Sequence, residues 1–418
     1  MIQSQDGLMD QIRDRFAYVD TCPEQGERIF FENAGGALTL KSVVDISAHY
    51  AAIPDNQGRD NDGSRALVSA IAKAKADAML FLNASSGQVF VGESGTELLF
   101  RMISNAVLET PAGDVIGSTL EHPASRSAAQ RWAKVAGKNY IAVPHDDETG
   151  SVSAEAYAAL VTPETRVATI IHTSPVTGMG VDVAAIVKTI RTVSPDCYII
   201  VDGIQHAAHG GLDVDQYDID GYAISPYKMF SRHGYGIAWI SDRLTMLPHD
   251  CLIDGPEGNW ELGTRDTGSY ATFSAVVDYF EWVGSNFTKS DDRREKIVAA
   301  GKAIHAHEQS LTDAMLHGTG NLKGLADFDE VSIIGGVNNP RREGLVAMNI
   351  ADMDAGELVE ALNKRGIRVH IRKADHYSGN ILNPLGLPSC VRVSMCHYNS
   401  EAEVARFLEA VRDIIAAR

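Results

Sequence analysis

The chain has 418 residues, with 37 Lys or Arg against 55 Asp or Glu, which gives a formal net charge of −18. This acidic excess disfavours general binding to nucleic acid or to an anionic membrane, because both attract positive charge. Hydrophobic residues make up 44% and charged residues 22%, as in a globular chain long enough for two domains. No apolar run approaches the ~20 residues of a membrane span, and the polar start lacks a secretory signal.

The cysteines are scattered and form no CxxC pair: Cys22, Cys197, Cys251, Cys390 and Cys396. This spacing disfavours a disulfide framework and a zinc site. We therefore expect no metal centre and a cytoplasmic setting.

Short β-branched runs alternate with amphipathic stretches through the first two thirds of the chain. The expected strands cover 89–92, 114–118, 140–144, 167–174, 198–203, 221–226 and 234–241. Helical patterns lie near 95–108, 124–136, 153–161 and 182–193. Strands separated by helices predict an α/β domain with a mostly parallel central sheet.

The pattern is mostly helical from about residue 270 to 316 and then changes again. Further strands are expected at 331–335, 345–350, 367–371 and 391–395, with helices near 354–365 and 400–417. We predict an N-terminal segment at 1–27, a large domain at 28–290 and a small C-terminal α/β domain at 291–418.

Polar side chains follow the ends of the expected strands, where open α/β sheets bind their ligands. They comprise an acid, a lysine, a histidine and several hydroxyl groups: Ser94, Gly95, Thr96, Glu121, His122, Ser174, Asp202, Gln205, Ser225, Tyr227 and Lys228.

In the segment YIIVDGIQ, the apolar run YIIV leads directly into Asp202, which either caps the next turn or faces a cationic group. A metal is a weaker alternative, since His206 and His209 follow at loose spacing. Lys228 comes one strand later, as a snorkelling surface charge or as an amine able to form a Schiff base. An acid and a lysine at the ends of successive strands suit pyridoxal phosphate (PLP), whose ring nitrogen and aldehyde they would hold.

The segment GESGTELLF offers backbone amides and hydroxyls at a helix start, where a phosphate is favoured. By itself such a segment is more often only a helix cap. His122, in STLEHPAS, is either structural or able to stack on a planar ring.

Together these motifs resemble the class V aminotransferase superfamily of fold-type I PLP enzymes, in particular its cysteine desulfurase and selenocysteine lyase branch. The resemblance runs from about residue 28 to the C-terminus. It comprises FFENAGGALTL, VFVGESGTE, the His of LEHPAS, VDGIQH, SPYK, ELGTRDTG and VRVSMCHYN. It implies PLP as cofactor and a small α-amino acid as substrate.

The resemblance also implies a role for each matching residue. Lys228 would form the Schiff base, Asp202 would pair with the pyridine nitrogen, and His122 would stack on the ring. Gln205 would contact the ring hydroxyl. The phosphate would be bound by Gly95, Thr96, Ser225 and Tyr227, with Thr264 reaching the phosphate of a neighbouring subunit in a homodimer with shared active sites. The substrate would be bound by Arg392, which clamps its carboxylate, and by Asn33 and Gly35.

Three positions depart from the family pattern. Tyr227 stands where members usually have His, and Pro175 stands where many have Asn. The segment HIRKADHYSGNILNPLGLPS contains no cysteine, although persulfide-forming desulfurases carry one on a loop there. His376 and Tyr377 occupy that place, as in a desulfurase-like subgroup. Cys390 and Cys396 flank the Arg392 strand instead.

We therefore expect a PLP-dependent lyase that cleaves a C–S bond or eliminates a β-substituent without a cysteine nucleophile. An aminotransferase and then an amino-acid epimerase are the alternatives, because all three reactions begin alike. A nucleotide oxidoreductase is disfavoured by the absence of GxGxxG, and a non-catalytic scaffold by the presence of both Lys228 and Asp202. The basic loop with His370, Arg372, Lys373 and His376 is either a solvated face or a pocket for a second acidic group on the substrate.

Overall fold

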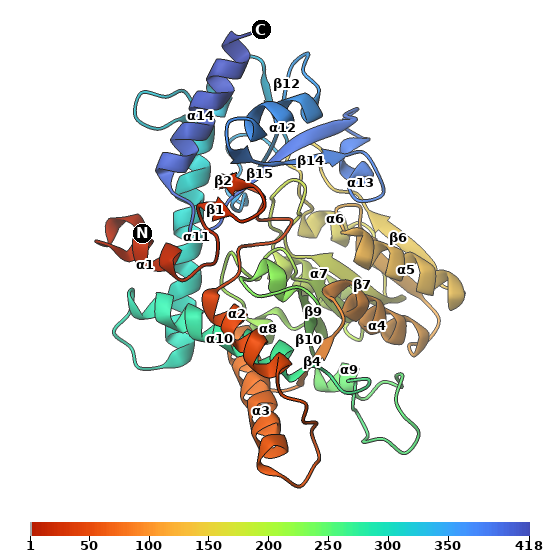
Figure 1. Ribbon diagram of the computed structural model, residues 1–418. Helices are drawn as coiled ribbons and strands as arrows, with labels where there is room; N and C mark the ends of the chain where they lie inside the picture. Colours follow the sequence, from red (N-terminus) through yellow and green to blue (C-terminus); the bar gives the residue numbers. More distant parts are fainter. Residues whose placement is uncertain (1) are drawn as a thin grey trace.

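The computed structural model describes residues 2–418, which fold around a seven-stranded sheet of order β4-β10-β9-β8-β7-β5-β6 (Figure 1). Its strands are β4 (Gln88–Gly92), β5 (Asp114–Ser118), β6 (Asn139–Val143), β7 (Thr165–Ile171), β8 (Tyr198–Asp202), β9 (Gly221–Ile224) and β10 (Gly236–Ile240). Only β10 runs antiparallel to its neighbours, β4 and β9. The prediction of a mostly parallel α/β sheet is therefore confirmed.

One strand ends earlier than the sequence predicts. β7 stops at Ile171, whereas the strand predicted from the sequence continues to Ser174. The Ser174 hydroxyl accepts hydrogen bonds from the backbone N–H groups of Val176 and Thr177, at 3.3 and 3.2 Å. This local turn, which contains Pro175, replaces further pairing in the sheet.

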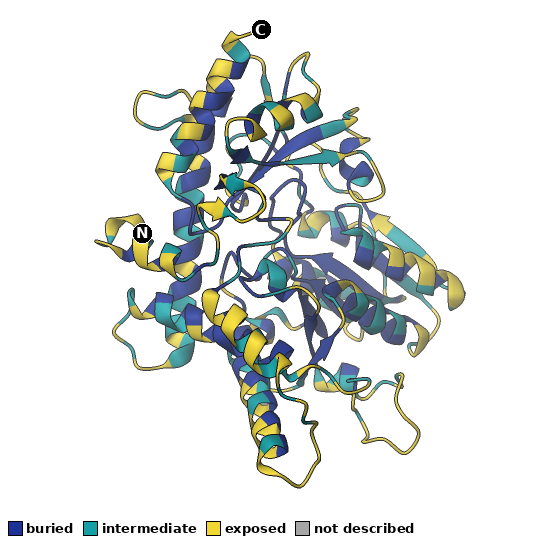
Figure 2. Cartoon of the chain, viewed as in Figure 1, coloured by how far each residue is buried: buried dark blue, intermediate teal, exposed yellow. Residues whose placement is uncertain are grey.

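Helices cover both faces of the sheet, so that its strands are buried (Figure 2). One face packs against α4 (Gly95–Leu108) and α5 (Pro123–Val135). The other packs against α3 (Asp62–Leu82), α7 (Val183–Val193), α10 (Thr267–Ser285) and α11 (Arg293–His317). Shorter helices are α1 (Leu8–Asp14), α2 (Lys41–Ala51), α6 (Ala154–Ala158), α8 (Val214–Tyr217) and α9 (Asp242–Thr245).

The start of α4 shows how the sequence sets a helix boundary at the edge of the sheet. Ser94 has extended backbone geometry, and its hydroxyl accepts a hydrogen bond from the N–H of Glu97 at 3.1 Å. The helix then buries an apolar face that includes Leu98, Leu99 and Met102. Cap and apolar face together place the N-terminus of α4 at the carboxyl end of β4.

The small domain contains a second sheet of order β11-β12-β15-β14. Its elements are β11 (Val331–Ile333), β12 (Leu345–Ile350), α12 (Ala355–Asn363), β14 (His370–Lys373), α13 (Gly379–Leu382), β15 (Ser389–Ser394) and α14 (Glu401–Ala416). The single strand expected at 367–371 is divided. β13 (Ile367–Arg368) pairs in parallel with β3 (Ile29–Phe30), whereas β14 pairs with β15, because the chain changes partners at Val369.

The two hydrophobic cores meet along α11. Ile297 and Ile304 belong to the core beneath the large sheet, and Leu311 and Met315 belong to the small-domain core. The change of core therefore falls inside one continuous helix, which couples the two domains rigidly. Residues 29–31 also join the small-domain core, so the early chain contributes to both domains.

The first residues form a short 3-10 helix (Ile2–Ser4) and α1, whose apolar side chains enter the large-domain core. A two-stranded ribbon of β1 (Thr21–Cys22) and β2 (Gly26–Glu27) follows. Among the helices of residues 2–418, none is both long and apolar enough to cross a membrane.

We predict that Gly284→Ala destabilises the protein. A Cβ at this buried position of α10 would lie 1.8 Å from the backbone oxygen of Lys296 in α11, so the two helices would have to separate. Alanine favours helices by about 1 kcal/mol over glycine, but overpacking costs about 1–3 kcal/mol or more, and the clash is with backbone. The urea midpoint of unfolding should fall. Gly211→Ala, where a Cβ meets open space, is the control; equal midpoints for both variants would contradict the packing argument.

Candidate active site

Asp202 and Lys228 lie together at the carboxyl edge of the large sheet. Asp202 is the last residue of β8 and is 4% exposed, and Lys228 ends the 3-10 turn Pro226–Lys228 that follows β9. The Lys228 Nζ donates to the Gln205 side-chain oxygen at 3.2 Å, and the N–H of Ile204 donates to Asp202 at 3.1 Å. The structure thus brings together the acid, the lysine and the glutamine that the sequence singled out.

Burial perturbs both charged groups. It lowers the pKa of Lys228 to about 7, with a further lowering from Arg392, while Asp202 opposes the shift. Burial also raises the pKa of Asp202 to about 6, against the stabilising N–H of Ile204 and the charge of Lys228. A substantial share of the Lys228 amine is therefore neutral near pH 7, the form that attacks an aldehyde. Asp202 remains mostly ionised and suits a cationic ring nitrogen.

His122 lies beside this pair as the N-cap residue of α5. Its Nδ1 accepts a hydrogen bond from the N–H of Ala124 at 3.2 Å. Burial, followed by the positive charges of Lys228, Arg372 and Arg126, lowers the pKa of His122 to about 3. The imidazole is therefore neutral at physiological pH, which suits contact with a ring face better than proton donation.

The start of α4 and the Ser225 side chain form a tight cradle. A Cβ at Gly95 would lie 2.4 Å from the Ser225 Oγ, so only glycine allows this approach. The first N–H groups of a helix have no intrahelical acceptor and carry positive partial charge. Gly95 is buried in the cradle, and Thr96 is exposed beside it. Such a cradle fits a phosphate group.

Tyr227 is half-buried next to Lys228. Its ring stacks on His233 with centroids 4.3 Å apart, and its carbonyl accepts a hydrogen bond from the N–H of Ala37 at 3.0 Å. Burial raises the pKa of the Tyr227 phenol, so its hydroxyl stays protonated and able to donate. The site therefore keeps a donor at the position where the family pattern has His.

Arg392 enters the site from β15 of the small domain. It is 2% exposed, and its Nη1 donates to the carbonyl of Pro175 at 2.9 Å, while its Nε has no hydrogen-bond partner in residues 2–418. A Cβ at Gly35 would lie 3.4 Å from the Arg392 Nη2. Burial and the neighbouring Arg372 lower the pKa of Arg392 to about 9. Gly35 and Arg392 thus meet, as the sequence predicts.

Asn33 does not present a free amide. Its side-chain nitrogen donates to the Ser394 carbonyl at 2.8 Å, and its side-chain oxygen accepts from the Tyr398 hydroxyl. Contact of the Asn33 side chain with a substrate would require this buried network to break. The expectation that Asn33 binds the substrate directly stays a prediction.

Thr264 lies apart from the other predicted site residues. It is exposed and lines a cavity of 360 Å³ with the connection between α2 and α3, and no other predicted site residue lines that cavity. Its predicted contact with the phosphate of a neighbouring subunit stays a prediction.

A hydrogen-bonded chain behind Lys228 was missed by the sequence analysis. The Gln205 side-chain nitrogen lies 3.5 Å from His209 Nε2, and His209 Nδ1 lies 2.7 Å from the Glu308 carboxylate. Burial acts to lower the pKa of His209, but Glu308 outweighs it and the pKa is raised. Glu308 lies on α11, about a hundred residues away in the sequence, and no local motif marks it.

Cys396 adds a third potential metal ligand near His209 and Glu308, with all three ligand atoms within 4.8 Å of one another. His209 and Glu308 are, however, hydrogen-bonded to each other, and burial raises the pKa of the Cys396 thiol. Because the thiolate is the form that binds metals, we assign no metal site here.

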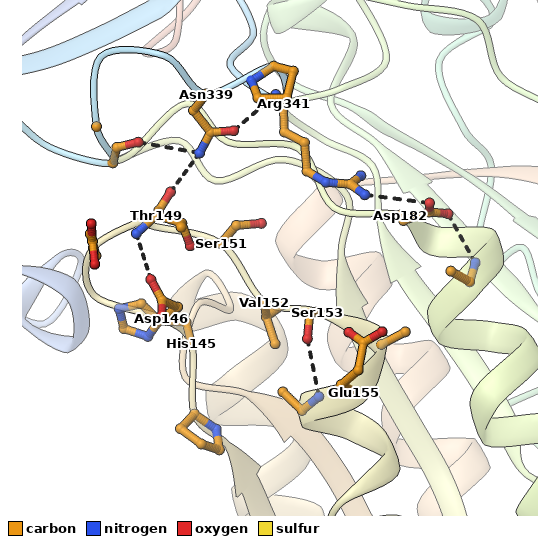
Figure 3. A pocket seen from close by; sticks show the side chains of 18 of the residues that line it. His145, Asp146, Thr149, Ser151, Val152, Ser153, Glu155, Asp182, Asn339 and Arg341 are labelled. Carbon is orange, nitrogen blue, oxygen red and sulfur yellow. Dashed lines mark hydrogen bonds and ion pairs between the residues drawn. The ribbon is translucent and has the colours of Figure 1, made fainter.

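A separate groove of 990 Å³ runs between the domains (Figure 3). In it the Asn339 side chain donates to the Thr149 carbonyl at 3.0 Å, and Arg341 lies 3.6 Å from Asp182. None of the predicted site residues lines this groove. Its contacts tie the small-domain loop to the large domain.

The whole chain is similar to known PLP enzymes. The aminotransferase class-V family model matches residues 29–407, and the chain therefore belongs to the class V aminotransferase family. An aminotransferase-like protein of Gibberella zeae is 25% identical over 420 residues, covering 97% of this chain and 98% of the relative. A cysteine desulfurase-like protein of Aspergillus flavus is 25% identical over 411 residues, covering 93% and 88%.

Solved structures show the same fold. The cysteine desulfurase of Thermococcus onnurineus NA1 has a TM-score of 0.82 at 20% identity, and each chain is covered to 98%. The cysteine desulfurase CsdA of Escherichia coli has a TM-score of 0.77 at 20% identity, with the same coverage. The prediction of a fold-type I PLP enzyme is confirmed, and the chain is a PLP-dependent enzyme. The Gly95–Ser225 cradle, the buried Asp202 and the low-pKa Lys228 fit that cofactor.

The lowered pKa of Lys228 predicts how cofactor uptake depends on pH. Only the neutral amine attacks the aldehyde, so the initial rate at which apoprotein gains the yellow absorbance of lysine-bound PLP should rise with pH around about 7. Stopped-flow absorbance between pH 5.5 and 9 measures this dependence. Lys41→Ala, an exposed lysine, should behave as the unmodified protein, whereas Lys228→Ala should gain no band. A rate that still rises about tenfold per pH unit as the pH approaches 9 would contradict the shift, because it would indicate an amine with an unshifted pKa.

Loss of the Glu308 carboxylate should destabilise the fold. Glu308→Ala leaves His209 buried without its ion partner, and breaking a buried pair in this way costs about 3–5 kcal/mol. Glu308→Gln retains a hydrogen-bond acceptor and should cost less. Urea unfolding measures both variants, with the exposed Asp313→Ala on the same helix as control. A Glu308→Ala variant as stable as Asp313→Ala would show that the pair contributes nothing.

Proposed function

We propose that the protein uses PLP to eliminate a β-substituent from a small α-amino acid, including cleavage of a C–S bond, without a cysteine nucleophile. The observation that carries this proposal is the buried Arg392 guanidinium, which reaches the same site as Lys228 and Asp202 with no carboxylate of its own. Its planar fork suits a substrate carboxylate in bidentate contact.

The bound cofactor supplies an electron sink for the bonds at the substrate Cα. Asp202 would keep the ring nitrogen protonated, Gln205 would contact the ring hydroxyl, and His122 would cover one ring face. The phosphate would lie against the amides of Gly95 and Thr96 and the side chains of Ser225 and Tyr227. Lys228 would hold the cofactor aldehyde and would accept the proton from the substrate Cα, for which its pKa of about 7 is suited.

The cysteines near the site are poorly suited to accept sulfur. Cys390 and Cys396 are buried, and burial raises the pKa of Cys390 to about 11 and holds that of Cys396 well above its ordinary value. The thiolate is the reactive form, so neither thiol is primed for attack. The loop after β14 carries exposed Tyr377 in place of a cysteine. These features favour direct release of the leaving group over persulfide formation.

An aminotransferase is the second candidate, favoured by the similarity to the aminotransferase-like protein of Gibberella zeae. It would share the removal of the Cα proton and then return that proton to the cofactor carbon. An epimerase comes third, because it needs a proton donor on the opposite ring face. His122 is a poor donor there, since its pKa is lowered to about 3.

We also infer a cytoplasmic homodimer with shared active sites. All five cysteines are free thiols, which suits a reducing compartment. Thr264 is exposed and therefore available to a second subunit. Mixing inactive Lys228→Ala and Thr264→Ala chains would test the sharing of residues, because hybrid dimers would regain one complete site.

Product analysis tests the reaction. The PLP-loaded protein is incubated with a panel of amino acids, and pyruvate, sulfide and pyridoxamine phosphate are measured. We expect a keto acid and the leaving group in equal amounts, at a rate that Lys228→Ala lowers by at least about 10³-fold. Pyridoxamine phosphate with a stoichiometric keto acid would instead identify an aminotransferase. A well-folded protein that gains no absorbance with PLP would overturn the cofactor assignment.

A further inference from the structure

Two arginines project from the same face of the small-domain sheet. In β15, Val391 and Val393 enter the small-domain core, whereas Cys390 and Arg392 point the other way. Arg372 of β14 pairs with Cys390, and paired residues in an antiparallel ladder share a face. Arg372 and Arg392 are therefore diagonal neighbours on the face toward the active site, with Cα atoms roughly 7–8 Å apart.

Neither guanidinium has an acidic partner. Within residues 2–418, no carboxylate lies within 4.0 Å of the nitrogens of Arg372 or Arg392. The nearby Glu32 is occupied, because it lies 2.6 Å from Arg368 and 3.1 Å from His370. Arg372 itself only donates from Nε to the buried Ser378 hydroxyl at 2.8 Å. The charges of the exposed Asp375 and of Glu32 act on Arg372 and Arg392 from beyond ion-pair distance. Two partly desolvated cations that form no ion pair are costly in a folded protein, so they indicate a site for anions.

Arg372 belongs to the space around the cofactor-binding residues. Its guanidinium lies 5.9 Å from the Tyr377 ring centre, and that ring lies 6.1 Å from His122. The Asn380 side chain holds the same loop on the large domain by donating to the Thr119 carbonyl at 2.6 Å. The charge of Arg372 also acts to lower the pKa of Lys228, which confirms that the two groups lie close.

The other members of the basic loop are placed differently. Lys373 is exposed on the opposite face of β14, and His376 is exposed in the following loop. His370 shares the face of Arg392 but contacts Glu32. Among the four basic residues of this loop, all within the described chain, Arg372 is thus the one that faces the site and forms no ion pair.

Charge balance sets the class of ligand. Lys228, Arg372 and Arg392 face Asp202, while burial and the charge of Asp202 raise the pKa of Glu121 to about 8 and keep that acid neutral. A substrate α-carboxylate balances Arg392 alone. The predicted phosphate site belongs to α4 and Ser225 on the large domain, so within residues 2–418 the carboxylate that acts most on Arg372 is the exposed Asp375, which forms no ion pair with it.

We propose that Arg372 binds a second acidic group on the side chain of the substrate, so that the enzyme selects amino acids with a carboxylate or another small oxyanion on the side chain. This inference rests on the proposed function, in which Arg392 binds the α-carboxylate. The side-chain acid would lie between Arg372 and the Tyr377 ring.

Spectral titration tests this selectivity. PLP-loaded protein is titrated with L-aspartate, L-glutamate, L-cysteine sulfinate and L-alanine, and the change in the visible band gives an apparent Kd for each. We expect the acidic amino acids to bind at least about 10-fold more tightly than L-alanine. Arg372→Gln should remove that preference, so that the acidic amino acids bind no more tightly than L-alanine. Arg372→Lys should retain part of the preference, because the charge remains.

Lys373→Gln is the matched control, since it removes one positive charge from the same strand on the opposite face. Unchanged selectivity in Lys373→Gln, together with its loss in Arg372→Gln, supports the subsite. Equal Kd values for L-alanine and the acidic amino acids in the unmodified protein would overturn it, whatever the variants do. Failure of the proposed function is distinguishable, because the product analysis would then show no keto acid and leaving group in equal amounts, whatever the Kd values are. Comparison of the carboxylates with L-cysteine sulfinate identifies which oxyanion is preferred.

Discussion

The opposed charges of the half-buried Lys228 and the buried Asp202, at one edge of the mostly parallel sheet, are the constraint on which the site depends. Burial penalises both charged forms, so the amine loses its proton more readily and the acid gains one more readily. Each group partly stabilises the ionised form of the other. The pair persists because the adjacent parallel strands β8 and β9 end at the same edge, where Asp202 is the last residue of β8 and the turn after β9 carries Lys228. A lysine with a pKa near 7 follows from this placement, and its reactivity toward an aldehyde follows from that pKa.

The small domain completes the site through hydrogen bonds to backbone carbonyls of the large domain as well as through the charge of its arginines. Arg392 reaches across the domain boundary and donates a hydrogen bond to the Pro175 carbonyl. Many family members have Asn at position 175, and here the main chain of Pro175 makes the contact with the arginine. The loop that contains Tyr377 is held on the large domain by Asn380. Because α11 belongs to both hydrophobic cores, these contacts form between domains whose relative placement is already restricted.

The positive charge of this site contrasts with the rest of the molecule. The chain carries a net charge of −18, yet Lys228, Arg372 and Arg392 converge near Asp202, and within residues 2–418 none of these three cations forms an ion pair with a carboxylate. A surrounding negative surface would weaken the approach of anionic ligands by long-range steering, whereas the buried guanidiniums act over short distances. Selectivity for anions in this protein therefore belongs to contacts within the site and to the desolvation of those contacts.

The sequence by itself determined the alternation of strands and helices, the cofactor class, and the residues at the ends of β8, β9 and β4. These features depend on local patterns: an apolar run that ends in Asp202 or Lys228, and a Ser-Gly-Thr cap before an apolar helix. Only the tertiary structure decided which polar side chains are hydrogen-bonded to other groups of the protein. Asn33 matched a family motif but is held by Ser394 and Tyr398, and Glu308 carried no motif but supports His209 behind the lysine. The sequence also left open whether the basic loop is a solvated face or a pocket. The pairing of β14 with β15 shows that Arg372 and Lys373 lie on opposite faces of the sheet. The physical reason is that hydrogen-bond partners and the face of a strand depend on contacts between residues far apart in the chain, which local periodicity does not encode.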